Sequence, residues 1–210
     1  MKGKGINMKE KALQFMFLLF VLLMLAAGSV KAQVVNGGFE ESGPLSPSEN
    51  SIFLKSLKAN NWKFEEPLVY PAGWQVNTNT KDGEYRLVKD SAQSHSGNNC
   101  VFIKGHLMIR KVIAVTPGDE IDLSFYVKDP EKKEAIIYYY SYGKTDEGKR
   151  MNTGGFSFKT ETEAEWSKKE WKFTVPENSG GRKLYELLLA ITSKTGVYYD
   201  DIEMTHKKSQ

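Results

Sequence analysis

The chain of 210 residues lacks several features that mark common enzyme and metal-site classes. Cys100 is its only cysteine, so no disulfide can form within the chain, and no paired Cys/His spacing for zinc exists. It contains no Gly-x-Ser-x-Gly elbow, no His-Glu-x-x-His helix and no phosphate-binding glycine loop. Its three histidines have no partners at the spacing of a metal site or a catalytic triad. We therefore expect no catalytic residues and no enzyme activity.

The sequence also lacks an apolar run long enough for an ordinary membrane span, although a shorter apolar run lies near the N-terminus. A lysine-rich stretch precedes the apolar run Phe15–Ala27, and the small residues of Val30–Ala32 follow. This order of charge, apolar core and small-residue site is typical of a secretory signal peptide. The run is shorter than the roughly 20 residues that span a bilayer, although a retained N-terminal anchor is the alternative. We predict a signal peptide over residues 1–32 and a protein that is secreted, periplasmic or held in the cell envelope.

The basic charge of the chain belongs to this N-terminal segment. Residues 1–32 hold five lysines and one glutamate, so without them the formal net charge falls from +3 to −1. A chain of near-zero net charge gives no electrostatic reason to expect a nucleic acid or an anionic membrane as partner. We expect neither, and no transmembrane segment after cleavage.

The remaining residues show many short strand patterns and no long helical period. Turn residues separate them, as at Pro117-Gly118-Asp119 and Ser179-Gly180-Gly181. The expected strands are 100–103, 123–127, 136–142, 156–159, 171–175, 184–192 and 197–204. This pattern predicts an all-β, antiparallel sandwich as one domain over residues 33–206. Residues 43–71, with four of the seven prolines, are expected to form a long loop insertion, and residues 207–210 a frayed polar tail.

Several short motifs resemble, in order, those of bacterial carbohydrate-binding modules with a galactose-binding-like jelly roll, the kind appended to xylanases and glucanases. They are Val35-Asn36-Gly37-Gly38-Phe39-Glu40, Pro71-Ala72-Gly73-Trp74, the turn Ser94–Asn99, Val115-Thr116-Pro117-Gly118 with Leu123–Val127, Trp166 with Phe173-Thr174-Val175-Pro176, and Tyr199-Asp200-Asp201-Ile202. The resemblance covers Val34–Met204 and implies a jelly-roll β-sandwich. This fold also carries protein-interaction and structural domains, so it does not fix the function.

The resemblance also implies a structural calcium ion where the first and last strands meet. The corresponding ligands here are Glu40, Asp200 or Asp201, and carbonyl groups near Gly38 and Asn98. Calcium prefers several oxygen ligands, and carboxylates from both ends of the chain would join the sandwich. The alternative is that Glu40 and Asp201 are solvated residues at strand ends.

A sugar-binding surface needs flat rings with polar groups beside them. In a strand over residues 136–142, Tyr138, Tyr140 and Tyr142 share one face, and Ile137 and Tyr139 share the other. Trp62 lies in the predicted insertion, where we expect no core to hold it. Trp74 and Trp166 are expected in the core, whereas Trp171 is ambiguous. The hydroxyl partners proposed for the sugar are Arg150, Asn152, Gln75 and Asn77.

The sequence thus predicts an exported, non-catalytic module that binds a polysaccharide or oligosaccharide on Trp62, Tyr138, Tyr140, Tyr142 and Arg150. The tyrosines could instead belong to a core strand, since buried tyrosine is common. A protein-interaction or cell-envelope structural domain of the same fold is the main alternative, and a small polysaccharide-active enzyme is a third. Exposure of the tyrosine row would favour a sugar, whereas buried rings and a broad apolar patch elsewhere would favour a protein partner.

Overall fold

A computed structural model describes residues 36–44 and 47–209, which lie in Lys31–Gln210, the second of two compact units of the chain. The predicted signal peptide, residues 1–32, lies outside the described residues. No helix in the described part of the chain is long and apolar enough to cross a membrane. The elements are β1 (Ser42–Pro44), α2 (Pro47–Ala59), β2 (Val69–Pro71), β3 (Trp74–Val76), β4 (Glu84–Lys89), β5 (Asn99–Ile109), β6 (Ile113–Ala114), β7 (Glu120–Lys128), β8 (Glu134–Lys144), β9 (Arg150–Glu161), β10 (Ser167–Thr174), β11 (Asn178–Ser179), β12 (Arg182–Lys183) and β13 (Glu186–Lys207).

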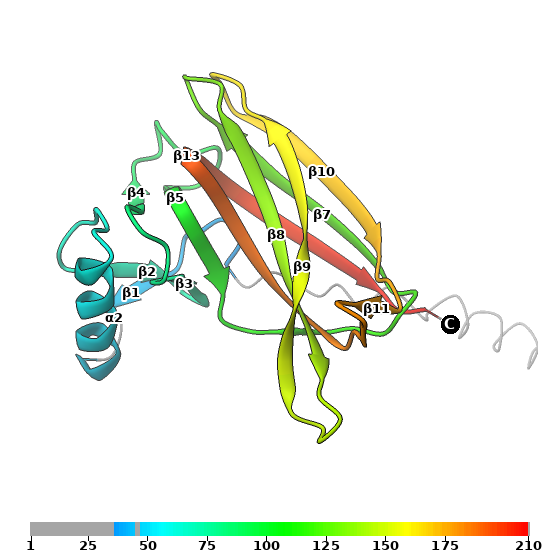
Figure 1. Ribbon diagram of the computed structural model, residues 1–210. Helices are drawn as coiled ribbons and strands as arrows, with labels where there is room; N and C mark the ends of the chain where they lie inside the picture. The colour runs from blue at the N-terminus through cyan, green and yellow to red at the C-terminus, as the bar shows by residue number, and fades with distance from the viewer. Residues whose placement is uncertain (1–35, 45–46, 210) are drawn as a thin grey trace, which may run out of the picture. The chain divides into compact units, whose positions relative to one another are not determined.

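Two layers of antiparallel strands enclose the core (Figure 1). The first layer has the order β9-β8-β13-β5, with β3 and β4 both paired to β5, and the second has the order β10-β7-β13. Side chains of the two layers meet in the interior: the Tyr139 ring on β8 lies 5.4 Å from the rings of both Trp171 and Phe173 on β10. The predicted all-β, antiparallel jelly-roll sandwich is confirmed.

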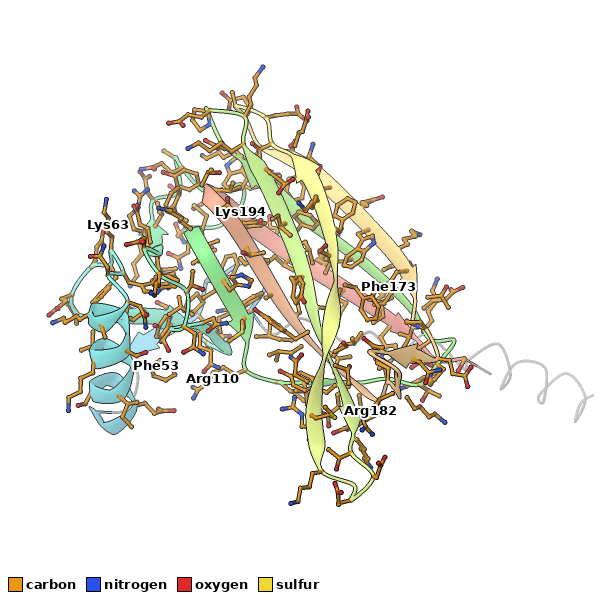
Figure 2. All side chains as sticks on the ribbon, in the orientation of Figure 1. Phe53, Lys63, Arg110, Phe173, Arg182 and Lys194 are labelled. Carbon is orange, nitrogen blue, oxygen red and sulfur yellow. The ribbon has the colours of Figure 1, made fainter. Side chains whose placement is uncertain are left out.

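The strand β13 belongs to both layers. Its first part, up to Thr192, pairs with β8 and β5, and its last part, from Tyr198, pairs with β7. The register shifts between Ser193 and Val197, and Figure 1 shows the orange and red parts of β13 diverging there. Lys194 lies at this bend (Figure 2). The two strands expected over residues 184–192 and 197–204 are therefore one strand of 22 residues.

The expected loop insertion over residues 43–71 is wrong in part, because it contains the helix α2. Strands β1 and β2, which flank the helix, pair with each other, so the segment closes on itself as a hairpin. Leu57 on α2 is buried in the core, whereas Ile52 is 70% exposed. Phe53 of α2 reaches Tyr70 on β2, with ring centroids 6.5 Å apart (Figure 2). The segment is thus a packed part of the domain.

The expectation of a frayed tail over residues 207–210 is also wrong for residues 207–209, which are held in place. The strand β13 extends to Lys207, and the Lys208 ammonium donates a hydrogen bond to Asp119 Oδ2 at 3.2 Å. The Ser209 amide donates to Asp119 Oδ1 at 2.8 Å. His206, expected at the surface, is buried and its Nε2 lies 2.7 Å from Asp119 Oδ2. A buried carboxylate fixes this end of the strand.

Candidate functional site

The alternation predicted for residues 136–142 is confirmed by strand β8. Tyr138, Tyr140 and Tyr142 are partly exposed on the outer face of the first layer, whereas Tyr139 is 0% exposed and belongs to the core. Because residues i and i+2 of a strand point to the same side, the three outward rings form a row. We call Tyr138, Tyr140 and Tyr142 the tyrosine row.

The neighbouring strand β9 leaves this row uncovered. Tyr138 and Tyr140 contact each other edge to face, with ring centroids 4.6 Å apart. Gly155 on β9 lies opposite Tyr140, and a Cβ atom there would lie 2.5 Å from the Tyr138 hydroxyl. Only a glycine permits the Tyr138 ring to lie across β9 in this way. The Tyr138 ring therefore lies over Gly155, and both rings are partly exposed at the outer surface.

His106 on β5 fixes the orientation of the central ring. The Tyr140 hydroxyl lies 2.8 Å from His106 Nδ1, and burial lowers the pKa of His106. Burial also raises the pKa of Tyr140, although a hydrogen bond with Asn77 opposes this change. Both groups are therefore uncharged near neutral pH, and a hydrogen bond joins the hydroxyl to the neutral imidazole, with the donor set by the tautomer of His106. The ring is held in place without a formal charge at the surface.

Arg150 closes one end of the tyrosine row. Its guanidinium carbon lies 3.5 Å from the centroid of the Tyr142 ring, and its Nε donates to Glu186 Oε2 at 2.6 Å. The guanidinium thus covers one face of Tyr142, which leaves Tyr138 and Tyr140 as the rings open to a ligand. The Arg150–Glu186 pair supplies donors and acceptors at the rim of this surface.

The predicted calcium ligands meet at the turn Ser94–Asn99. Glu40 Oε1 accepts hydrogen bonds from the amides of Asn98 and Asn99, at 2.8 and 2.9 Å. Asp200 Oδ2 accepts from the amide of His95 at 2.9 Å. Residues from the two ends of the domain therefore hold one turn by hydrogen bonds, and we call this arrangement the terminal staple.

Asp201 contacts the same turn beside Asp200. Its Oδ1 accepts a hydrogen bond from Ser96 Oγ at 2.7 Å, and its Oδ2 lies 2.6 Å from His95 Nδ1. A Cβ atom on Gly38 would lie 3.1 Å from Asp201 Oδ1, so the backbone at Gly38 also approaches closely. Burial and the nearby Asp201 charge raise the pKa of Asp200 to about 6.

The chemistry of these oxygens suits calcium, but their arrangement does not form a carboxylate cage. Over residues 36–44 and 47–209, no three His, Cys, Asp or Glu side chains are grouped to hold a metal ion. The oxygens of Glu40 and Asp200 are instead directed to backbone amides. Calcium at the terminal staple stays a prediction.

No family model matches the chain, and no curated protein matches it. Solved structures similar to it include the CBM22-1 xylan-binding domain from Paenibacillus barcinonensis Xyn10C, with 14% identity, 66% of this chain and 88% of that chain covered, and a TM-score of 0.42. A family 16 carbohydrate-binding module is 17% identical over 57% of this chain and 84% of that one, with a TM-score of 0.39. An apo form cyclase from Fischerella sp. is 14% identical over 88% and 99%, with a TM-score of 0.48. The function of this chain has to be argued from its own residues.

The expectation that Trp62 is a surface ring is wrong. Trp62 is 6% exposed and its Nε1 donates to the Thr80 carbonyl at 2.6 Å. Its amide donates to the Leu57 carbonyl at 3.0 Å, and Asn61 before it has a φ of 57°. This is a left-handed helix end, in which the residue that follows packs back on the last turn. Trp62 ends α2 and fills the core, so it cannot stack on a sugar.

Several residues of the site could not be identified from the sequence. His106 and Glu186 meet the tyrosine row through strands that are distant in the chain, and Gly155 meets it through the register of the next strand, β9. A histidine, a glycine and a glutamate in strands carry no local signal for this role. The core position expected for Trp166 is also wrong, because it is partly exposed on the outer surface.

Proposed function

We propose that this protein is a non-catalytic glycan-binding module that stacks a sugar ring on Tyr138 and Tyr140. The observation that carries the proposal is the pair of partly exposed rings, 4.6 Å apart, one of which lies over Gly155 on the neighbouring strand. Tyrosine rings offer a flat apolar face that matches the C–H side of a pyranose at little cost in side-chain entropy. The surface is shallow, which suits a polymer that passes over it.

Polar groups around the rings support orientation of the bound sugar. Asn77 and His106 lie at Tyr140, and the Arg150–Glu186 pair lies at Tyr142. These groups offer both donors and acceptors, as sugar hydroxyls require. Among the described residues, the carboxylate in register with the tyrosine row on β13 is Glu186, which is paired with Arg150. A hydrolase of the common type needs two carboxyl groups, so binding without catalysis is the better supported function.

The alternative function, docking of a protein partner, has less support. Among the described residues, Ile52 is the one large apolar side chain that is exposed, so no broad apolar patch accompanies the tyrosine row. Protein-binding surfaces are usually marked by such patches. The N-terminal sequence supports an exported module that captures its glycan outside the cytoplasm, in the periplasm, at the envelope or in the medium.

Retention of the chain 33–210 on a panel of immobilised plant, algal and microbial polysaccharides tests the proposal. We expect retention on one glycan class, and binding at least about tenfold weaker in Tyr140→Ala, a loss of about 1.4 kcal/mol. Tyr126→Ala is the matched control, because Tyr126 is also partly exposed but lies on β7 in the second layer. Failure of a folded sample on every glycan, or equal losses in both variants, would contradict the proposal.

A further inference from the structure

A second group of rings and cations crosses the outer surface away from the tyrosine row. Arg86 on β4 pairs in register with Phe102 on β5, Phe102 pairs with Tyr198 on β13, and Tyr198 pairs with Lys128 on β7. Trp166, just before β10, adjoins Lys128. All five side chains are partly exposed. We call Arg86, Phe102, Tyr198, Lys128 and Trp166 the cationic strip.

Each cation of the strip rests on aromatic rings. The Arg86 guanidinium lies 4.3 Å from the centroid of Phe102 and 5.9 Å from that of Tyr198. The Lys128 ammonium lies 4.7 Å from the centroid of Trp166 and 5.5 Å from that of Tyr198. Tyr198 is thus flanked by both cations. Such contacts hold a charge in place at the surface without neutralising it.

The two cations keep hydrogen-bond donors free for a ligand. The Lys128 ammonium donates to the Gln93 carbonyl at 2.5 Å, and within the described parts of the chain no carboxylate lies at ion-pair distance from it. Trp166 Nε1 donates to the same carbonyl at 3.2 Å, which fixes the ring beside Lys128. Arg86 Nε is buried and forms an ion pair with Glu84 Oε1 at 3.2 Å without hydrogen-bond geometry, so Glu84 offsets part of the Arg86 charge while the donors of the terminal nitrogens have no partner among the described residues. An ammonium has three donors and a guanidinium five, so most remain free.

The strip opens at its Arg86 end into a groove of about 470 Å³. Arg86, Lys89 and Gln93 contribute to its lining, together with Glu65 and Glu66. The two glutamates disfavour an anionic group within the groove itself. Negative groups of a ligand are therefore favoured over the strip, and neutral groups can extend into the groove.

We propose that the cationic strip is a second binding site, specific for an acidic, carboxylate-bearing oligosaccharide that lies across the strands. The backbones of Arg86 and Lys128 are three strand spacings apart, about 14 Å, and their charged groups lie 5.9 and 5.5 Å from the Tyr198 centroid. Two carboxylates of one short chain can therefore meet them. A sugar ring between these carboxylates lies over Tyr198. Phe102 and His106 are four residues apart on β5, about 13 Å along the strand, which separates this site from the tyrosine row.

The observations favour this ligand over simpler ones. A single small anion would need its donors grouped around one point, whereas these two cations are separated by rings. A neutral glycan would gain nothing from cations that are held at the surface. The planar guanidinium of Arg86 suits a carboxylate, to which it can donate two parallel hydrogen bonds.

Titration of the chain 33–210 with tetragalacturonate, and with its neutral methyl ester, tests the proposal by calorimetry and by tryptophan fluorescence. We expect binding of the acid, weaker in 0.5 M salt because exposed charges are screened, and little binding of the ester. Arg86→Gln and Lys128→Gln should each weaken binding at least about tenfold, with melting temperatures showing that both remain folded. Lys172→Gln, the same charge change at a side chain that is 71% exposed on β10, should change the affinity less than twofold.

Equal affinity for acid and ester, or equal effects of Lys128→Gln and Lys172→Gln, would overturn the proposal. Tighter binding of single-stranded DNA, lost in the same two variants, would assign the strip to a nucleic acid instead. Retention on neutral polysaccharides and its dependence on Tyr140 are measured in a separate experiment. The proposals for the tyrosine row and for the cationic strip can therefore be contradicted independently of each other.

Discussion

Asp119 shows how a single buried side chain can fix one end of the domain. It is 0% exposed and accepts hydrogen bonds from the amides of Ser209 and Thr116, from Lys208, and at 2.7 Å from His206 Nε2. Burial opposes ionisation of this carboxyl, but the hydrogen bonds outweigh it and hold its pKa well below the ordinary value of 3.8. A group with a depressed folded-state pKa stabilises the fold above its unfolded pKa, and this contribution is lost as the pH falls further.

Asp119→Asn is therefore expected to destabilise the domain by about 1–3 kcal/mol at pH 7, since charged hydrogen bonds in a buried site are lost. The difference in unfolding free energy from the unchanged protein should narrow as the pH falls below 3.8, because the unfolded chain then binds a proton at Asp119 while the folded protein keeps this carboxyl ionised. Urea denaturation at pH 7 and pH 2.5 measures both values. Asp146→Asn is the control, because that side chain is 89% exposed and should cost less than about 0.5 kcal/mol. An effect of Asp119→Asn on the free energy of unfolding that is equal at pH 7 and pH 2.5 would contradict the role given to this carboxylate.

Among the elements, the helix α2 is where sequence and structure differ most. Its apolar residues are few and are bracketed by prolines, so residues 43–71 show no long helical period. The stop signal is present as Asn61, which adopts the left-handed conformation that ends many helices. The β8 alternation was predicted correctly because a period of two is set within the strand itself. The residues that lie against the outward tyrosines of β8, His106 and Gly155, could not be predicted, because strand order and register depend on the whole chain.

Removal of the buried side chain of α2 tests whether the helix belongs to the core. Leu57 is 1% exposed, so Leu57→Ala should cost about 2–5 kcal/mol by leaving a cavity. Ile52→Ala, on the same helix at 70% exposure, should change the free energy of unfolding by less than about 0.5 kcal/mol. Urea denaturation of both variants gives the comparison. Equal small losses would mean that α2 does not pack on the sandwich.

At the scale of the whole molecule, the terminal staple links the two ends of the domain. Glu40 and Asp200 hold the turn Ser94–Asn99 by hydrogen bonds, and Asp201 adds a second carboxylate beside Asp200. Two neighbouring carboxylates repel each other, and a cation between such groups would relieve the repulsion. Calcium at the terminal staple stays a prediction, and the contacts of these carboxylates are hydrogen bonds to the turn.

If calcium binds at the staple, it should raise the melting temperature by several degrees relative to a chelator, since 1 kcal/mol corresponds to about 2–4 °C for a domain of this size. Glu40→Gln should abolish the difference between calcium and chelator, whereas the exposed Glu165→Gln should leave it intact. Thermal unfolding followed by circular dichroism measures all three proteins. Identical melting curves of the unchanged protein in calcium and in chelator would contradict the predicted ion.

The position of β13 in the chain affects when the protein can fold. This strand follows every other strand in the sequence, yet it lies between β8 and β5 in one layer and beside β7 in the other. A nascent chain on the ribosome therefore holds all the outer strands before it holds the one that joins them. The first layer cannot close before synthesis has passed Thr192, and the second layer cannot close before the part of β13 that begins at Tyr198 has been made. The order of synthesis thus keeps the two layers apart until their shared strand exists.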